Sequence, residues 1–318
     1  MDIEYLLALQ RLREATGTFL PELLGVVSKI AVSELPVLMI CFVYWAFDRQ
    51  AGKRIIGGLS LGLFVNGLLK LTFCVYRPWI RDARVLPYGD AKVAATGYSF
   101  PSGHSTWATA CFGGVGEWLR RMGWRALCVV LWVFVALVMF SRNLLGVHTP
   151  QDVLVGFGAT ALSMFAIYKL EAWTDEDPRR DLYVLVGGLL VCVAAVAYYE
   201  LKPYPLDYNA DGSLLVDPMQ MANDSFQGIG LLGSYVVCRF IERRGFDFDR
   251  KLTMRERIAC GIVGLIPLYL LVTLGMGLVK SLFGAATKNV VMFAAIVFYA
   301  MVVMPAAMGL VAKVRDRR

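Results

Sequence analysis

The chain has only two histidines, His104 and His148, and basic residues accompany both. His104 ends the run SFPSGH at residues 99–104, and His148 lies between Arg142 and Asp152. Histidine is the side chain whose ordinary pKa lies nearest neutrality, so it serves as a proton shuttle and as a nucleophile. We therefore predict that both histidines take part in catalysis.

The residues around the histidines suit a phosphoryl group. Lys70, Arg77 and Arg142 supply three cations for the charged oxygens of such a group, and arginine adds forked, bidentate donors. Ser102 and Gly103 open a predicted helix, and the free N–H groups at a helix start bind anions. Ser102 adds a hydroxyl donor, and Gly103 lets the backbone approach the anion closely. One histidine can attack phosphorus while the other protonates the leaving alcohol. We find no tight His and carboxylate cluster, so we expect no metal and no cofactor.

The composition indicates an integral membrane protein, because 58% of the residues are hydrophobic and only 18% are charged. We predict an all-α polytopic bundle of about nine transmembrane helices, each with roughly 20 apolar residues. The predicted spans are 24–47, 55–76, 102–120, 124–142, 150–171, 181–200, 221–241, 257–280 and 286–312. Nucleic-acid binding is excluded because the basic residues sit in short loops between spans.

The charge distribution predicts how the chain crosses the membrane. With nine alternating spans, 20 of the 32 Lys and Arg residues fall on one side, including the basic run from Arg239 to Arg257. The positive-inside rule makes that side cytoplasmic, so the N-terminus lies outside and the C-terminus inside. Every motif residue then lies at a helix end on the extracytoplasmic face, where four helix ends can converge on a single pocket. The predicted location is the plasma (inner) membrane.

The same pattern divides the chain into three parts. Residues 1–20 are predicted to form an interfacial amphipathic helix, because apolar positions alternate there with charges. Residues 21–175 hold all the motifs and form the catalytic phosphatase core, which comprises spans one to five. Residues 176–318 form an accessory transmembrane region, spans six to nine, without a motif.

Three spaced motifs resemble the signature of the type-2 phosphatidic acid phosphatase superfamily, which includes lipid phosphate phosphatases and glucose-6-phosphatases. They are Lys70 with Arg77-Pro78, residues 101–104 (PSGH), and Ser141-Arg142 with His148 and Asp152. The resemblance implies that His148 is the nucleophile that forms a phosphohistidine and that His104 is the general acid. It also implies that Asp152 orients His148 and that turnover needs no metal. The phosphate ligands that it implies are Lys70, Arg77, Ser102, Gly103 and Arg142.

Several residues have alternative interpretations. Thr149-Pro150-Gln151-Asp152 reads as a helix start, and Asp152 can cap that helix as well as orient His148. For Ser141, capping span four or bonding a neighbour is as reasonable as a role in the site. Arg81, Arg84 and Glu34 are possible substrate-selecting residues, although a solvated loop for the arginines and a structural partner for Glu34 are at least as reasonable.

One loop raises the question of a cation. The segment 207–212 (DYNADG) resembles the opening of a calcium loop, but Pro218 stands where the closing glutamate is needed. A solvated turn or a substrate lid is therefore the preferred interpretation of the 202–219 loop.

These observations together predict a membrane phosphatase that hydrolyses a lipid phosphate monoester or diphosphate. The alternatives are a phosphatase of a soluble sugar phosphate and a phosphotransferase with an acceptor other than water. A transporter or scaffold would not need the full catalytic set. The expected partner is the lipid phosphate substrate, and the sequence does not indicate an oligomeric state.

Overall fold

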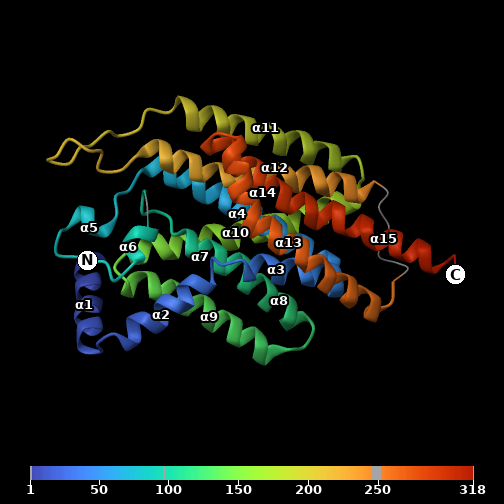
Figure 1. The fold of residues 1–318 in the computed structure, drawn as a ribbon, viewed down its shortest axis with the longest axis horizontal. Coiled ribbons are helices and arrows are strands. Elements are labelled where there is room, and N and C mark those ends of the chain that lie inside the picture. Colours follow the sequence, from blue (N-terminus) through green and yellow to red (C-terminus); the bar gives the residue numbers. More distant parts are fainter. Residues whose placement is uncertain (1, 96, 245–251, 318) are drawn as a thin grey trace.

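The computed structural model describes residues 2–95, 97–244 and 252–317. Within these residues the secondary structure is helical, apart from one isolated bridge between Tyr208 and Leu214. The N- and C-termini lie at opposite ends of the bundle (Figure 1). Arg250 and Lys251, which belong to the basic run, lie outside the described residues.

Helices occur at every predicted span. Along the chain they are α1 (Asp2–Ala15), α2 (Phe19–Ile30), α3 (Leu35–Phe42), α4 (Arg49–Phe73), α5 (Pro78–Arg81), α6 (Ala91–Ala94), α7 (Gly103–Ala108), α8 (Gly114–Arg121), α9 (Arg125–Leu144), α10 (Pro150–Glu176), α11 (Arg180–Leu201), α12 (Pro218–Arg243), α13 (Met254–Leu282), α14 (Ala285–Phe298) and α15 (Met304–Arg315). Three π-helical turns join consecutive helices: η1 (Val43–Phe47), η2 (Thr109–Gly113) and η3 (Tyr299–Val303).

Six of the described helical segments are long and apolar enough to cross a membrane, or seven if the bent pair at 19–47 counts as one span. The predicted spans 102–120 and 221–241 correspond to α7–η2–α8 and to α12, which do not meet this standard of length and composition. The chain is therefore an all-helical protein with several candidate membrane spans, and the number nine stays a prediction.

The first predicted span is a broken helix. The segments Phe19–Ile30 and Leu35–Phe47 meet at an angle of 45°. Pro36 lies in the first turn of α3, where its missing N–H is tolerated, but a helix continuing from α2 would need that donor. Proline therefore starts a new helix and turns the chain.

Helix α4 lies inside the bundle and packs against α10 and α12 (Figure 1). Glycines on α4 permit this close packing. A Cβ atom at Gly67 would lie 3.0 Å from the Ser225 Cβ of α12, and one at Gly62 would lie 3.2 Å from a Thr160 methyl of α10. The central helix thus connects the segment that carries the motifs with the helices that follow it.

A buried ion network ties these helices together at one end. Glu171 of α10 is 1% exposed and contacts Arg54 and Lys53 of α4, with N–O distances of 3.2 and 3.9 Å. Arg239 of α12 lies 4.0 Å from Glu171 and 2.8 Å from Asp181 of α11. Buried charges are tolerated when they are paired, so this network fixes how the four helices meet.

The other end of the bundle is crossed by α1 (Figure 1). Arg13 of α1 is buried and donates to the carbonyl groups of Leu86 and Leu144, at 2.8 and 3.2 Å. The amide of Leu86 in turn donates to Gln10. Helix α1 therefore braces the loop after α5 against the end of α9.

Candidate active site

The first motif is placed by the end of α4. Lys70 lies in the last turn of this helix, which ends at Cys74 in the left-handed conformation, with φ of 47°. The ammonium group of Lys70 is buried and donates to the carbonyl oxygens of Tyr98 and Pro101, at 3.1 and 2.9 Å. Lys70 therefore joins the end of α4 to the loop that carries the second motif.

The second motif forms the start of α7. Ser102 is the N-cap residue, and its hydroxyl accepts a hydrogen bond from the Ser105 amide at 3.4 Å. The Ser102 amide donates to the carbonyl of Asp152 at 2.9 Å. A Cβ atom built at Gly103 would meet no other atom within 4 Å, so there is open space beside the first turn of α7. An anion can approach the backbone there.

The third motif places His148 in the short loop between α9 and α10. Its Nε2 atom lies 2.9 Å from Nη1 of Arg77, and its Nδ1 atom lies 3.4 Å from Oδ2 of Asp152. Since guanidinium only donates, Nε2 accepts from Arg77, and the ring proton belongs on Nδ1, facing Asp152. This tautomer leaves the Nε2 lone pair on the side of the cations.

Asp152 caps α10 and contacts His148 at the same time. Its Oδ2 atom accepts from the Thr149 amide at 2.8 Å, while the Thr149 hydroxyl accepts from the Asp152 amide. The same oxygen accepts from the hydroxyl of Ser99 at 2.5 Å. The two interpretations of Asp152 therefore coexist, because a capping box holds the carboxylate that faces the histidine.

Burial determines the charge of His148, which is 2% exposed and lies outside the membrane-spanning helices. Burial, and then the neighbouring Arg77 guanidinium, lower the pKa of His148 well below 6.5, against the opposing effect of Asp152. The imidazole is therefore neutral near pH 7, which is the state a nucleophile requires.

Arg142 contributes a buried donor without a partner. The residue lies in the last turn of α9, and its Nη1 atom donates to the hydroxyl of Ser28 on α2 at 2.7 Å. Its Nε atom is buried and has no hydrogen-bond partner among the described residues. Leaving a charged donor unpaired is costly, so this atom fits a ligand with acceptor oxygens.

His104, in the first turn of α7, lies near the three cations. Lys70, Arg77 and Arg142 all interact with it electrostatically, and so does His148. The His104 ring has no hydrogen bond with any described residue and is partly exposed. The structure thus brings the eight motif residues that we predicted for catalysis and phosphate binding to one end of the bundle.

The possible substrate-selecting residues make other contacts. Arg81 pairs with Asp2 of α1 at 2.8 Å, and Arg84 pairs with Glu4 and Asp82 at 3.2 and 2.7 Å. Glu34 lies at the break between α2 and α3, and its side chain has no hydrogen bond or ion pair with a described residue. The described contacts of Arg81 and Arg84 attach the loop to α1.

Three polar residues that we did not select belong to the site. Ser99 binds Asp152, Ser28 binds Arg142, and the Asn143 amide donates to the His148 carbonyl at 2.9 Å. Ser99 and Asn143 adjoin the motifs in the sequence, and this position could have identified them. Ser28 lies far from the motifs in the sequence, so no pattern there identifies it. Ser141 donates to the Val138 carbonyl of its own helix, so its contacts favour a local structural role.

Protein donors engage two acidic groups of the 202–219 loop. Asp207 accepts a short hydrogen bond from the Tyr76 hydroxyl, and Asp211 accepts from the amide and hydroxyl of Ser213. No group of three or more His, Cys, Asp or Glu side chains arranged to hold a metal ion occurs among residues 2–95, 97–244 and 252–317. The turn interpretation therefore accounts for Asp211, whereas Asp207 attaches the loop to Tyr76.

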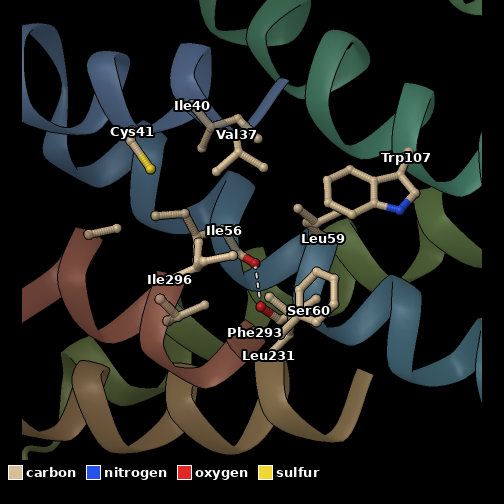
Figure 2. Close-up of a pocket in the computed structure, with 12 residues that line it drawn as sticks. Val37, Ile40, Cys41, Ile56, Leu59, Ser60, Trp107, Leu231, Phe293 and Ile296 are labelled. Carbon is tan, nitrogen blue, oxygen red and sulfur yellow. Dashed lines mark hydrogen bonds between the residues drawn. The ribbon is translucent and has the colours of Figure 1, made fainter. Parts of the chain in front are cut away.

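A narrow apolar cavity of about 30 Å³ lies between α3, α4, α7, α12 and α14 (Figure 2). Trp107, one helical turn beyond His104, lines it. The hydroxyl of Ser60, another lining residue, donates to the Ile56 carbonyl within α4. The remaining lining residues are Val37, Ile40, Cys41, Leu59, Leu231, Phe293, Ile296, Val297 and Ala300.

Comparison with known proteins agrees with this geometry. No solved structure matches the chain. Residues 52–175 match the family model described as the PAP2 superfamily, and this segment contains Lys70, Arg77, both histidines and Asp152. The type-2 phosphatidic acid phosphatase superfamily is thus the family to which residues 52–175 of this chain belong.

Proposed function

We propose that this protein hydrolyses a lipid phosphate monoester or diphosphate through a phosphohistidine intermediate at the extracytoplasmic face of the membrane. Membership of a phosphatase superfamily supports the reaction class. The observation that carries the mechanism is the position of His148, with Nε2 toward the Arg77 guanidinium and Nδ1 toward Asp152.

In the first step, Nε2 of His148 attacks phosphorus, and the bond from phosphorus to the alcohol oxygen breaks. His104, kept protonated by the negative charge of the bound substrate phosphate, donates a proton to the departing oxygen. Asp152 stabilises the positive charge that develops on the His148 ring. Arg77 leaves Nε2 and binds the phosphoryl oxygens, together with Arg142. The short hydrogen-bond distance between Arg77 and His148 means that only a small movement is needed.

In the second step, water attacks the phosphohistidine. His104, now neutral, accepts the proton of that water, and the bond between Nε2 and phosphorus breaks to release inorganic phosphate. Both histidines return to their starting states, so protons balance over the cycle. The three cations stabilise the charge on the transferred group in both steps, which is how phosphoryl transfer is generally catalysed.

The position of the motif residues favours a lipid substrate. Lys70, Arg142 and Asp152 lie in end turns of helices that are apolar enough to cross a membrane. A phosphate bound there is expected near the depth of lipid head groups.

The test is phosphate release by purified protein reconstituted in vesicles, with a chelator present. Phosphatidate, an isoprenyl diphosphate, phosphatidylglycerol phosphate, a sphingoid phosphate and glucose 6-phosphate are compared. We expect chelator-resistant release from at least one lipid, loss of that release in His148→Ala, and wild-type release in Ser163→Ala, whose hydroxyl bonds only within α10.

The intermediate is tested separately by rapid quenching with labelled substrate, followed by mapping of the labelled peptide. We expect an acid-labile phosphate on His148. Release from glucose 6-phosphate alone would reject the lipid substrate. Transfer of label to an added alcohol instead of water would identify a phosphotransferase, and activity in His148→Ala would reject the nucleophile.

A further inference from the structure

A second, larger cavity lies at the end of the bundle opposite the motif residues. It has a volume of about 480 Å³ and is enclosed by the start of α4, by α8 and by α10. Arg54, which lines it, precedes Lys70 by 16 residues of the same helix, or about 24 Å at 1.5 Å per residue. The hydrocarbon core of a bilayer is about 30 Å thick, so this cavity lies near the opposite head-group layer.

Two arginines converge on one aromatic ring in this cavity. The guanidinium groups of Arg54 and Arg121 lie 4.9 and 5.7 Å from the centre of the Tyr168 ring. Glu171 and Glu117 accept hydrogen bonds from the Nε atoms of Arg54 and Arg121, respectively. The Nη groups of both arginines make no hydrogen bond with the described residues, so they are available to an anionic ligand.

The acidic residues of the cavity are already engaged. Glu117 accepts from Arg120 at 2.7 Å as well as from Arg121. Asp48 is the N-cap of α4 and accepts from the Ala51 amide at 2.9 Å. Both carboxylates are therefore held by neighbouring donors, and the Nη groups of Arg54 and Arg121 keep N–H donors for a ligand.

The cavity wall combines an unpaired donor with an apolar surface. The indole Nε1 of Trp118 is buried and has no hydrogen-bond partner among the described residues. Met164 and Phe165 of α10 form the apolar side. A buried N–H without a partner is uncommon, and it fits a ligand that brings an acceptor oxygen. The adjoining apolar surface fits a hydrocarbon chain on the same ligand.

We propose that this cavity binds a phospholipid of the membrane leaflet opposite the catalytic site. The lipid phosphate lies between Arg54 and Arg121 and accepts from the Trp118 indole, and one chain lies along Met164 and Phe165. The cavity volume is within the range of roughly 300–1,000 Å³ that is usual for small-molecule sites. This site is separate from the catalytic residues and does not depend on the reaction that they perform.

The experiment uses vesicles that contain phosphatidylglycerol with a diazirine on one acyl chain. The full-length protein is reconstituted, irradiated and mapped by mass spectrometry, so a lipid at the catalytic end is distinguished by the position of its label. Wild type, Arg121→Gln and Trp118→Phe are compared with Arg125→Gln, which removes an exposed charge at the same end of the bundle but outside the cavity.

We expect label on Met164 and Phe165 in wild type and in Arg125→Gln. Labelling there should fall about tenfold in Arg121→Gln, the effect of losing one charge-assisted hydrogen bond, and severalfold in Trp118→Phe. Equal labelling of all four proteins would overturn the proposal. So would competition by soluble glycerophosphoglycerol as effective as that by the intact lipid, because the site would then bind a free phosphodiester.

Discussion

At the scale of single residues, the Oδ2 atom of Asp152 joins three groups of the site. Ser99, at 2.5 Å, and the Thr149 amide, at 2.8 Å, both donate to it, and His148 lies 3.4 Å away. Ser99 also lies 3.4 Å from the His148 ring nitrogen. This hydroxyl therefore fixes the carboxylate and the imidazole relative to each other.

We predict that Ser99→Ala lowers kcat about tenfold and leaves KM nearly unchanged. Ser99 orients the proposed nucleophile and does not touch the phosphate, and one such hydrogen bond is worth about 1–2 kcal/mol. Steady-state kinetics of the reconstituted enzyme check this expectation. The matched control is Ser163→Ala, which removes a hydroxyl from the middle of α10. Equal kcat values for the two variants would show that Ser99 has no positioning role.

The lowered pKa of His148 predicts an acid-sensitive fold. Below pH 6.5 the unfolded chain takes up a proton on this residue that the folded chain does not, because burial and Arg77 lower the folded pKa. Stability is therefore present above pH 6.5 and is lost as the pH falls toward the folded pKa. From pH 7.5 to 5 the expected loss is about 2 kcal/mol.

Thermal unfolding in detergent across this pH range measures the effect. His148→Gln cannot take up the proton in either state, so it should lose less stability than wild type between pH 7.5 and 5. The two proteins should show the same pH dependence above pH 7.5. A variant that loses as much stability as wild type in the acid range would contradict the assignment of a neutral, buried His148.

At the scale of elements, the loop between α9 and α10 sets the position of His148. Gly146 in this loop has φ of +72°, and a Cβ atom there would lie 3.2 Å from the Leu86 carbonyl oxygen. Gly123, between α8 and α9, has φ of +88° and open space around it. The two glycines thus share a left-handed backbone but differ in their surroundings and in their distance along α9 from the catalytic loop.

We predict that Gly146→Ala and Gly123→Ala each cost about 1–2 kcal/mol of stability, because a left-handed backbone disfavours alanine. Gly146→Ala should also lower kcat severalfold, because its methyl group pushes against Leu86 and moves the loop that carries His148. Thermal unfolding and phosphate release, measured on both variants, separate these effects. An equal change of kcat in both would show that the loop tolerates the methyl group.

The elements also show where sequence reasoning succeeds. Apolar runs are set by local composition, so a helix occurs at each predicted span, and the spaced motifs identify the family. The break before α3 depends on one residue, Pro36, and the overall apolar character of the predicted span does not reveal it. Contacts such as Ser28 with Arg142, or Arg81 with Asp2, join segments 114 and 79 residues apart. Only the packing of α1 and α2 on the bundle determines such contacts, so local patterns cannot reveal them.

At the scale of the whole molecule, the orientation of the bundle decides which leaflet supplies the substrate. Helix α1, which contacts the end of α9 that carries Arg142, and the C-terminus lie toward opposite ends of the bundle (Figure 1). Of the 32 Lys and Arg residues, 20 fall on the predicted cytoplasmic side, and this side includes the C-terminal residues Arg315 and Arg317. We therefore predict that the 202–219 loop is extracytoplasmic and that the C-terminus is cytoplasmic.

Cysteine labelling measures this orientation. Asp211→Cys and Arg317→Cys each place a thiol at an exposed position, and the wild-type chain serves as the background because its seven cysteines are buried or half-buried. A membrane-impermeant maleimide should label Asp211→Cys in intact cells and Arg317→Cys only after permeabilisation. The reverse pattern would place the phosphate site on the cytoplasmic side. Its substrate would then come from the inner leaflet, and the phospholipid cavity would face the outer one.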